Sequence, residues 1–302
     1  MIETKDLTKE FNGKVAVDHL ALQIDDGEVF GFLGPNGAGK TTTVRMLTSL
    51  IAPTYGTARV LDFEVGKDDQ QIRKNVGILT ETPGLYERLS ARRNLQIYCK
   101  LYEVDNAERQ IEKYLRWLEL WDRRDDLAGE FSKGMRQKLA IARALIHEPR
   151  VLFLDEPTAG LDPEASKLVR DFIAELRGKG RTIFICTHNL DEADRLCDRI
   201  AVFKSRLRVV DTPQRLRDKF FGRQVVVHLA SDAQSFATTA LESPGIQKCE
   251  VIDDKLLLSL EDPERDNPEL IRRLVAAGAG VQFVGEIRHT LEDIYLQSLG
   301  ED

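Results

Sequence analysis

The sequence predicts an α/β fold in which crossover helices surround a parallel sheet, followed by a smaller α+β module. Two observations support the first part. Val151 to Leu154 and Thr182 to Cys186 are short apolar runs, which are typical of buried parallel strands. Between them, Asp162-Pro163 is typical of a helix start, because Asp caps the first turn and Pro suits the first helical position. Strand, helix and strand in this order predict a parallel sheet with crossover helices.

Short strands and one inserted helical block are expected earlier in the chain. Strand-like segments lie at residues 1–6, 15–17, 20–24 and 28–33. Residues 85–135 predict a helical subdomain. Four of its apolar residues recur at the spacing of one helix face: Ile111, Tyr114, Leu115 and Leu118. We expect this face to pack in the core of the subdomain; the alternative is that part of the surface receives a partner.

Residues 222–302 predict a separate accessory domain behind a first domain of residues 1–220. The expected order of elements is βαββαβ with a final helix, which is a ferredoxin-like arrangement. Its helices are expected to start at Ser231-x-x-Gln234, Asn267-Pro268 and Thr290-x-x-Asp293. The domain holds no chemical motif, so we expect a regulatory or dimerising role.

Composition narrows the class of protein. The chain has 302 residues, a hydrophobic content of 42%, a charged content of 31% and a net charge of −7. This balance gives no general basic footprint, so no nucleic-acid partner is expected. The first residues lack a signal-peptide pattern, and no apolar run approaches the ~18 residues that cross a bilayer. A membrane role is therefore expected to act through a partner. The four cysteines form no C-x-x-C pair and are expected to be reduced thiols.

A glycine-rich loop is the most informative segment of the chain. It has the pattern G-x-x-x-x-G-K-T and comprises Gly34, Pro35, Asn36, Gly37, Ala38, Gly39, Lys40 and Thr41, with Thr42 directly after it. Glycines let successive backbone N–H groups turn inward around phosphate oxygens. Lys40 can reach the β- and γ-phosphates, and the Thr41 hydroxyl can ligate Mg²⁺. The loop lies between an apolar strand and a helix whose N-terminus favours anions. The sequence therefore predicts a P-loop NTPase core.

Two carboxylates follow the apolar strand that ends at Leu154. An acid at the end of a strand that neighbours the phosphate loop can hold Mg²⁺, and we assign this role to Asp155. Glu156 comes next and is expected to polarise a water for in-line attack on the γ-phosphate. Many strands end in a solvated acid, so the two carboxylates alone would be weak evidence. The phosphate loop earlier in the chain is what indicates a catalytic role for them.

A Ser-x-Gly segment precedes an amphipathic helix at Lys138 to Leu145. Taken alone, Ser132 and Gly134 would indicate a helix cap or an anion site. Together with the phosphate loop, Asp155-Glu156-Pro157, Gly160-Leu161-Asp162 and Thr187-His188, the segment occurs in the order and spacing of one family. Residues 1–220 resemble the ATP-binding subunit of ABC transporters.

This resemblance implies a head-to-tail dimer with two ATPs at its interface. The segment Ser132-Lys133-Gly134-Met135 would face the phosphate loop of the other subunit, and Asp162 would link the two sites. His188 would contact the γ-phosphate and the region of the attacking water. Phe11 occupies the position at which the family stacks an aromatic ring on adenine.

Two departures from the family pattern stand out. The usual Leu-Ser-Gly-Gly-Gln is Phe131-Ser132-Lys133-Gly134-Met135 here, which keeps the serine and the second glycine. The usual glutamine between the core and the helical subdomain is Glu81, whose carboxylate can ligate Mg²⁺ but cannot donate as an amide does.

These variants, with Pro83 to Glu87 and Leu291 to Leu296, resemble the ABC-2 type exporter branch. That branch implies a separate multi-span permease, with this chain in the cytoplasm on the inner face of the cell membrane.

Three alternatives remain open at the level of sequence. The first is the ATPase subunit of an importer. The second is a soluble ABC ATPase acting on DNA or ribosomes; the space between Lys40 and Asp155 holds no long coiled coil, and the chain has a single cassette. The third is a different P-loop enzyme such as a small-molecule kinase, against which Ser132-x-Gly134 and His188 argue.

Overall fold

The computed structural model describes residues 1–80, 82–287 and 289–300, and the chain divides into two compact units, Met1–Thr212 and Pro213–Asp302. The division precedes helix α8 (Pro213–Phe221), whereas the expected boundary between residues 220 and 222 follows it. Helix α8 packs against α11 (Leu291–Gly300). Arg217 Nε donates to the His289 carbonyl over 2.9 Å, and the Phe221 ring stacks on His289. These contacts place α8 with the second unit.

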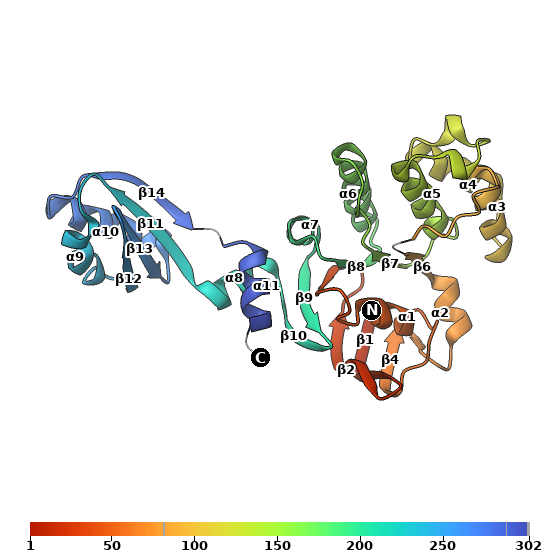
Figure 1. Cartoon of the computed structure of the whole chain (residues 1–302), viewed down its shortest axis with the longest axis horizontal. Coiled ribbons are helices and arrows are strands. Elements are labelled where there is room, and N and C mark those ends of the chain that lie inside the picture. Colours follow the sequence, from red (N-terminus) through yellow and green to blue (C-terminus); the bar gives the residue numbers. More distant parts are fainter. Residues whose placement is uncertain (81, 288, 301–302) are drawn as a thin grey trace. The chain divides into compact units, whose positions relative to one another are not determined.

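The first unit is built on a six-stranded sheet with the order β10-β9-β3-β8-β7-β6 (Figure 1). Its strands are β3 (Val29–Leu33), β6 (Val76–Leu79), β7 (Val151–Asp155), β8 (Thr182–Thr187), β9 (Arg199–Lys204) and β10 (Arg206–Asp211). Neighbouring strands are parallel, apart from the antiparallel pair β9 and β10. The segments that follow β3, β7 and β8 therefore leave the sheet at the same edge.

A second sheet with the order β2-β1-β4-β5 is antiparallel. Its strands are β1 (Ile2–Phe11), β2 (Lys14–Ile24), β4 (Tyr55–Val60) and β5 (Phe63–Glu64). The two segments expected at 15–17 and 20–24 form one strand, β2. The pairing with β1 is irregular beside His19, whose φ is 46°, so the alternation of apolar residues breaks there without ending the strand.

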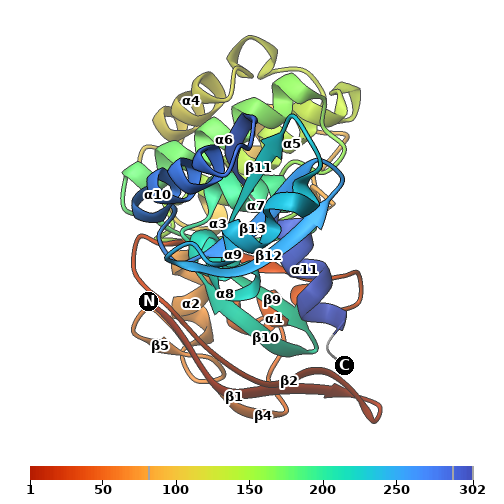
Figure 2. The ribbon, with the colours of Figure 1, turned by 90° about the vertical axis from the view of Figure 1, so that its left-hand side faces the viewer.

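Helices cover both faces of the parallel sheet. They are α1 (Lys40–Leu47), α2 (Asp69–Asn75), α5 (Lys133–Leu145), α6 (Pro163–Gly178) and α7 (Leu190–Leu196). Figures 1 and 2 show α1 and the antiparallel sheet on one side of the parallel sheet, with α5 and α6 on the other. Phe153 of β7 belongs to the core shared with α1, while Leu152 and Leu154 pack with α5 and α6. Alternate residues of a strand point to opposite faces, so one apolar run fills both layers.

The start of α6 lies where the sequence predicts it. Asp162 Oδ1 accepts a hydrogen bond from Ala165 N over 2.8 Å, and Pro163 is the first helical residue. The cap satisfies a donor that the first helical turn leaves unpaired.

The helical subdomain contains α3 (Ala91–Leu101), α4 (Ala107–Trp117), two short 3₁₀ turns (Trp121–Arg123 and Ala128–Glu130) and the start of α5. The predicted apolar face of α4 is confirmed as core. Its four residues are 0% exposed: Ile111, Tyr114, Leu115 and Leu118.

The second unit has the predicted βαββαβ order. Its four strands, β11 (Arg223–Leu229), β12 (Ile246–Ile252), β13 (Lys255–Leu260) and β14 (Val281–Ile287), form an antiparallel sheet with the order β12-β13-β11-β14. Helices α9 (Ala237–Leu241) and α10 (Pro263–Ala276), with the 3₁₀ turn Ala233–Phe236, supply the buried apolar residues that pack on it. This arrangement is the ferredoxin-like one.

Two predicted helix starts in this unit are wrong by a few residues. Asp232, rather than Ser231, caps the turn before α9, because its Oδ1 accepts from Gln234 N. Helix α10 begins at Pro263, and Pro268 lies inside it. The Thr290–Asp293 capping box of α11 is confirmed: Asp293 Oδ2 accepts from Thr290 N, and Thr290 Oγ1 accepts from Asp293 N.

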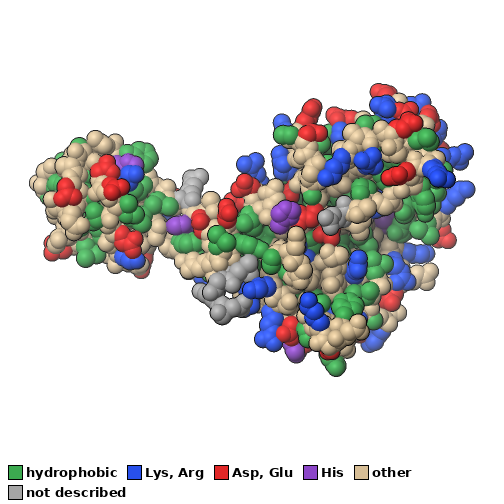
Figure 3. All heavy atoms as spheres, in the orientation of Figure 1, with side chains coloured by type: hydrophobic (Ala, Val, Ile, Leu, Met, Phe, Trp, Pro, Cys, Tyr) green, Lys and Arg blue, Asp and Glu red, His purple; other side chains and the backbone are tan. Residues whose placement is uncertain are grey.

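Two further properties concern the charges on the surface and the length and apolar character of the helices. On the face drawn in Figure 3, basic and acidic side chains are interspersed over the first unit. Within residues 1–80, 82–287 and 289–300, none of the helices has the length and apolar character to cross a bilayer.

Candidate functional site

The loop between β3 and α1 needs its glycines for two separate reasons. Gly37 and Gly39 have φ values of 80° and 104°, a conformation that residues with a Cβ rarely adopt. A Cβ on Gly34 would lie 2.2 Å from the Phe203 carbonyl oxygen, and one on Gly39 would lie 2.2 Å from that of Ala16. The loop therefore curls tightly against neighbouring backbone, so that its N–H groups can converge on an anion.

Lys40 begins α1 and is only 8% exposed. Its Nζ donates to the carbonyl oxygens of Gly34 and Pro35, over 2.5 Å and 3.2 Å. The loop thus holds the ammonium group over its own turn. A cation in this position can also meet the phosphate oxygens of a nucleotide.

Asp155 is the last residue of β7 and is 9% exposed. The Thr41 hydroxyl donates to its Oδ2 over 3.1 Å. A hydroxyl and a carboxylate side by side are ligands of the kind that Mg²⁺ accepts, together with substrate phosphates. The donor set therefore fits the cation that the sequence predicts.

Glu156 directly follows β7 with a φ of 51°, an uncommon conformation for a residue with a side chain. Its N–H donates to the Cys186 carbonyl over 2.8 Å. Its Oε1 accepts from His188 N over 3.1 Å and lies 2.7 Å from His188 Nδ1. Its Oε2 accepts from Thr187 Oγ1 over 3.3 Å. The carboxylate is thus held by both backbone and side chains at the end of β8.

These side chains converge on one pocket of about 260 Å³. Its lining consists of Ala16, Pro35, Asn36, Gly37, Ala38, Gly39, Lys40, Thr41, Thr42, Asp155, Glu156, Ala159 and His188. The structure therefore brings together most of the predicted phosphate loop, both carboxylates and the histidine. Ala16 and Ala159 were missed, because an alanine carries no chemical signal in a sequence.

The predicted site residues near the starts of α5 and α6 do not line this pocket among the described residues. Ser132 caps α5, with its Oγ accepting from Met135 N over 3.2 Å. The Lys133 side chain lies against Gly160, since a Cβ on that glycine would be 1.9 Å from Lys133 Nζ. Neither the segment from Ser132 to Met135 nor Asp162 is part of the pocket lining within the described residues.

Phe11 and Glu81 complete the predicted set. Phe11 ends β1 and is 47% exposed, with Lys9 Nζ 5.1 Å from the centre of its ring. Ala16, on the adjacent strand, lines the pocket, whereas Phe11 is not in the lining found for the described residues. Glu81 lies outside the described residues.

Comparison with known proteins identifies the family. Residues 17–159 match the family model described as ABC transporter. The Nod factor export ATP-binding protein I of Rhizobium sp. (strain N33) is 33% identical over 304 residues, which cover 100% of this chain and 97% of that protein. The chain belongs to the ATP-binding subunits of ABC transporters.

Further matches agree with this family. The bacitracin transport ATP-binding protein BcrA of Bacillus licheniformis is 34% identical over 302 residues, covering 99% of this chain and 97% of that protein. A solved structure of the ATP-binding subunit of an ABC transporter is 30% identical, with a TM-score of 0.68 over 73% of this chain and 93% of that one. Residues 212–299 match the model described as ATP-binding protein DrrA1-3-like, C-terminal domain.

The family confirms several predictions. The P-loop ABC ATPase fold, the binding of ATP and the class of enzyme, an ATPase, are as the sequence indicates. The C-terminal match and the relatives named for export and transport confirm the ABC-2 exporter branch.

Proposed function

We propose that this chain is the ATP-hydrolysing motor of an ABC-2 type export complex, in which closure of a dimer on two ATPs drives a separate permease and hydrolysis resets it. The observation that carries the proposal is the pocket in which the phosphate loop, Asp155, Glu156 and His188 meet. The match of residues 212–299 and the export relatives support the direction of transport. An importer role is the alternative.

We assign roles to the loop residues as part of this proposal. Residues Gly34 to Thr42 surround the triphosphate with backbone donors, and Lys40 balances the charge of the β- and γ-phosphates. Thr41 and Asp155 would hold Mg²⁺, with Glu81 as a further ligand. A bound Mg²⁺ supplies positive charge beside the phosphates.

Hydrolysis needs a water positioned in line with the γ-phosphate. Glu156 is 13% exposed in its side chain and is fixed at both oxygens by the end of β8, so its carboxylate is oriented in advance for such a water. His188 lies beside it with a side chain that is 67% exposed, so its ring is open to the γ-phosphate region. We assign Glu156 as the base and His188 as the contact with the γ-phosphate.

A second copy of the chain would complete each site. Ser132 to Met135 form the N-terminal turn of α5 and lie outside the pocket of their own chain. This placement supports a head-to-tail dimer in which the segment faces the phosphate loop of the partner, while Asp162, at the start of α6, links the two sites. Phe11 would contact adenine, as the resemblance implies; it lies on β1, whose neighbour β2 carries Ala16 of the pocket lining.

We place the chain in the cytoplasm, bound to the inner face of the membrane through a multi-span ABC-2 type permease. The second unit, Pro213–Asp302, would regulate or dimerise the complex. We assign no cargo, because cargo is bound by the permease; the relatives' names concern Nod factor export and bacitracin transport.

Isolation of the chain from its native membranes in mild detergent tests this function. The expected result is a stoichiometric partner that spans the membrane several times. Recovery with only ribosomes, nucleic acid or soluble proteins would overturn the transport role and favour a soluble ABC ATPase. Transport of the substrate into right-side-out membrane vesicles, rather than out of them, would favour the importer.

A further inference from the structure

Glu192 is a buried carboxyl group that the function described above does not use. It lies in α7, is 2% exposed and sits four residues after His188 in the chain. Its Oε2 accepts from Thr158 Oγ1 over 3.0 Å and lies 3.5 Å from Thr187 Oγ1. Its Oε1 is buried and has no hydrogen-bond partner among the described residues. Burial of a carboxyl group with an unpaired oxygen costs free energy, so the buried position of Glu192 requires a structural or functional explanation.

The two threonines connect Glu192 to different parts of the site. Thr158 lies in the segment that leads from Glu156 to Asp162, and Thr187 is the last residue of β8, next to His188. Glu192 N in turn donates to Asn189 Oδ1, and Asn189 N donates to Thr187 Oγ1. One carboxyl group thus joins the segment after β7 to the segment after β8.

Thr187 stands between two carboxyl groups. Its hydroxyl is 3.3 Å from Glu156 Oε2 and 3.5 Å from Glu192 Oε2. A hydroxyl has one proton, so it can donate to only one of them at a time. If Thr187 donates to Glu156, the Glu192 carboxyl must be protonated for the contact between Glu192 Oε2 and Thr187 Oγ1 to be a hydrogen bond.

The surroundings of Glu192 favour a protonated group. Burial raises the pKa of the Glu192 carboxyl, while the Thr158 hydrogen bond and the charge of Arg170 oppose the shift, and the nearby Glu156 carboxylate adds to it. A protonated Glu192 can donate to Thr187 Oγ1, which then donates to Glu156. Linked hydrogen bonds of this kind strengthen one another in a buried site.

We propose that Glu192 is a positioning residue for ATP hydrolysis, which acts through Thr187 to hold the Glu156 carboxylate and through Thr158 to tie the Asp162 segment to the His188 segment. The inference rests on the proposed role of Glu156. In this proposal α7 holds the segment after β7 and the segment after β8 at a fixed distance from each other, and the Glu156 carboxylate lies between them.

The test uses the purified full-length chain and measures kcat, KM for ATP, direct ATP binding and thermal unfolding. Glu192→Ala is expected to lower kcat by about 10- to 100-fold, as a small misplacement of a catalytic group does. KM and ATP binding are expected to stay within about two-fold, because the phosphate loop is untouched. Glu192→Gln should recover most of kcat, since an amide nitrogen in the place of Oε2 can donate one hydrogen to Thr187 Oγ1 and the other to Thr158 Oγ1. Asp191→Asn, at an exposed carboxylate on the same helix, is the matched control.

A second variant keeps the test decisive if Glu192→Ala does not fold. Thr187→Val preserves the shape of the side chain and removes the hydroxyl, and it should show the same loss of kcat with ATP binding retained. Wild-type kcat in Thr187→Val or in Glu192→Ala would overturn the proposal. An equal loss of kcat and ATP binding would overturn it too, because it would indicate a general structural defect.

Glu156→Gln, measured in parallel, separates this inference from the proposed function. If Glu156→Gln abolishes hydrolysis while the Glu192 and Thr187 variants keep it, only the positioning role fails. If Glu156→Gln hydrolyses ATP at the wild-type rate, the catalytic assignment fails and the positioning role fails with it.

Discussion

Thr41 and Asp155 meet at the carboxyl edge of the parallel sheet, where the threonine hydroxyl donates to Asp155 Oδ2 over 3.1 Å. The first residue belongs to α1 and the second to β7. Their contact joins the phosphate loop to the strand that carries both acidic residues. We propose that a cation lies here against the nucleotide.

Asp155→Asn should therefore weaken the binding of Mg²⁺ at the site of hydrolysis. We expect the Mg²⁺ concentration for half-maximal ATPase activity to rise by about 10- to 100-fold, because an amide oxygen replaces a charged ligand. Titration of Mg²⁺ at fixed ATP measures this. Asp105→Asn, at an exposed carboxylate, is the control. An unchanged Mg²⁺ requirement in Asp155→Asn would remove Asp155 from the cation site.

Gly37 and Gly39 provide a matched pair in the phosphate loop. Both have positive φ, but an added Cβ meets nothing within 4 Å at Gly37 and lies 2.2 Å from the Ala16 carbonyl oxygen at Gly39. Gly37→Ala should cost about 1 kcal/mol from backbone conformation alone. Gly39→Ala should cost clearly more and weaken ATP binding, because the loop must shift. Urea unfolding and ATP titration compare the two, and equal effects would mean that the close approach to Ala16 is unimportant.

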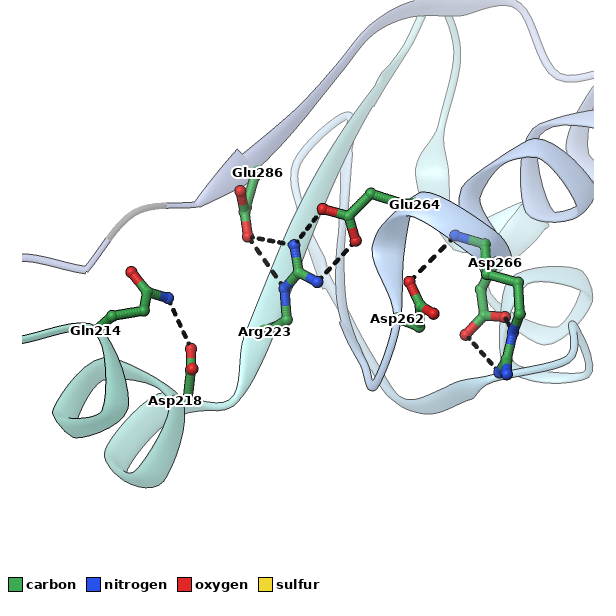
Figure 4. Close-up of polar contacts among 8 residues, drawn as sticks. Gln214, Asp218, Arg223, Asp262, Glu264, Asp266 and Glu286 are labelled. Carbon is green, nitrogen blue, oxygen red and sulfur yellow. Dashed lines mark hydrogen bonds and ion pairs between the residues drawn. The ribbon is translucent and has the colours of Figure 1, made fainter.

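Arg223 forms a two-pronged ion pair with Glu264 in the second unit and also contacts Glu286 (Figure 4). The Arg223 hydrogen bonds lower the pKa of Glu264 from 4.5 to about 2. A carboxyl whose pKa is lowered by folding adds stability above pH 4.5, and this contribution is lost as the pH falls toward 2. NMR titration should give a midpoint near 2 for Glu264. In Arg223→Gln the midpoint should move toward 4.5, and no movement would exclude Arg223 as the cause.

Local patterns made much of this molecule predictable from the sequence. Some features depend only on residues that are neighbours in the chain, so the sequence predicts them directly. They are the phosphate loop, the acidic end of β7 and the Asp162 cap. The start of α10 shows how a prediction from a local capping pattern can fail. Asp262-Pro263 and Asn267-Pro268 are both suitable helix starts, and the first prevails because Asp262 Oδ1 accepts from Arg265 N and the helix continues through Pro268.

Contacts between distant residues were not predictable in the same way. The whole of α6 and β8 and the start of α7 separate Thr158 from Glu192 in the chain, and only the folded sheet brings their side chains together. Neither residue belongs to a motif that indicates chemistry. The same holds for Ala16, whose place in the pocket wall results from the packing of β2 against the phosphate loop.

The ATPase rate of Glu156→Gln, measured together with the oligomeric state of this variant in ATP and Mg²⁺, tests the proposed role of Glu156 directly. The amide keeps the shape of the side chain but cannot act as a base. We expect a loss of activity of about 10²- to 10⁴-fold and the accumulation of an ATP-bound dimer. Hydrolysis at the wild-type rate, with no dimer formed, would contradict this role.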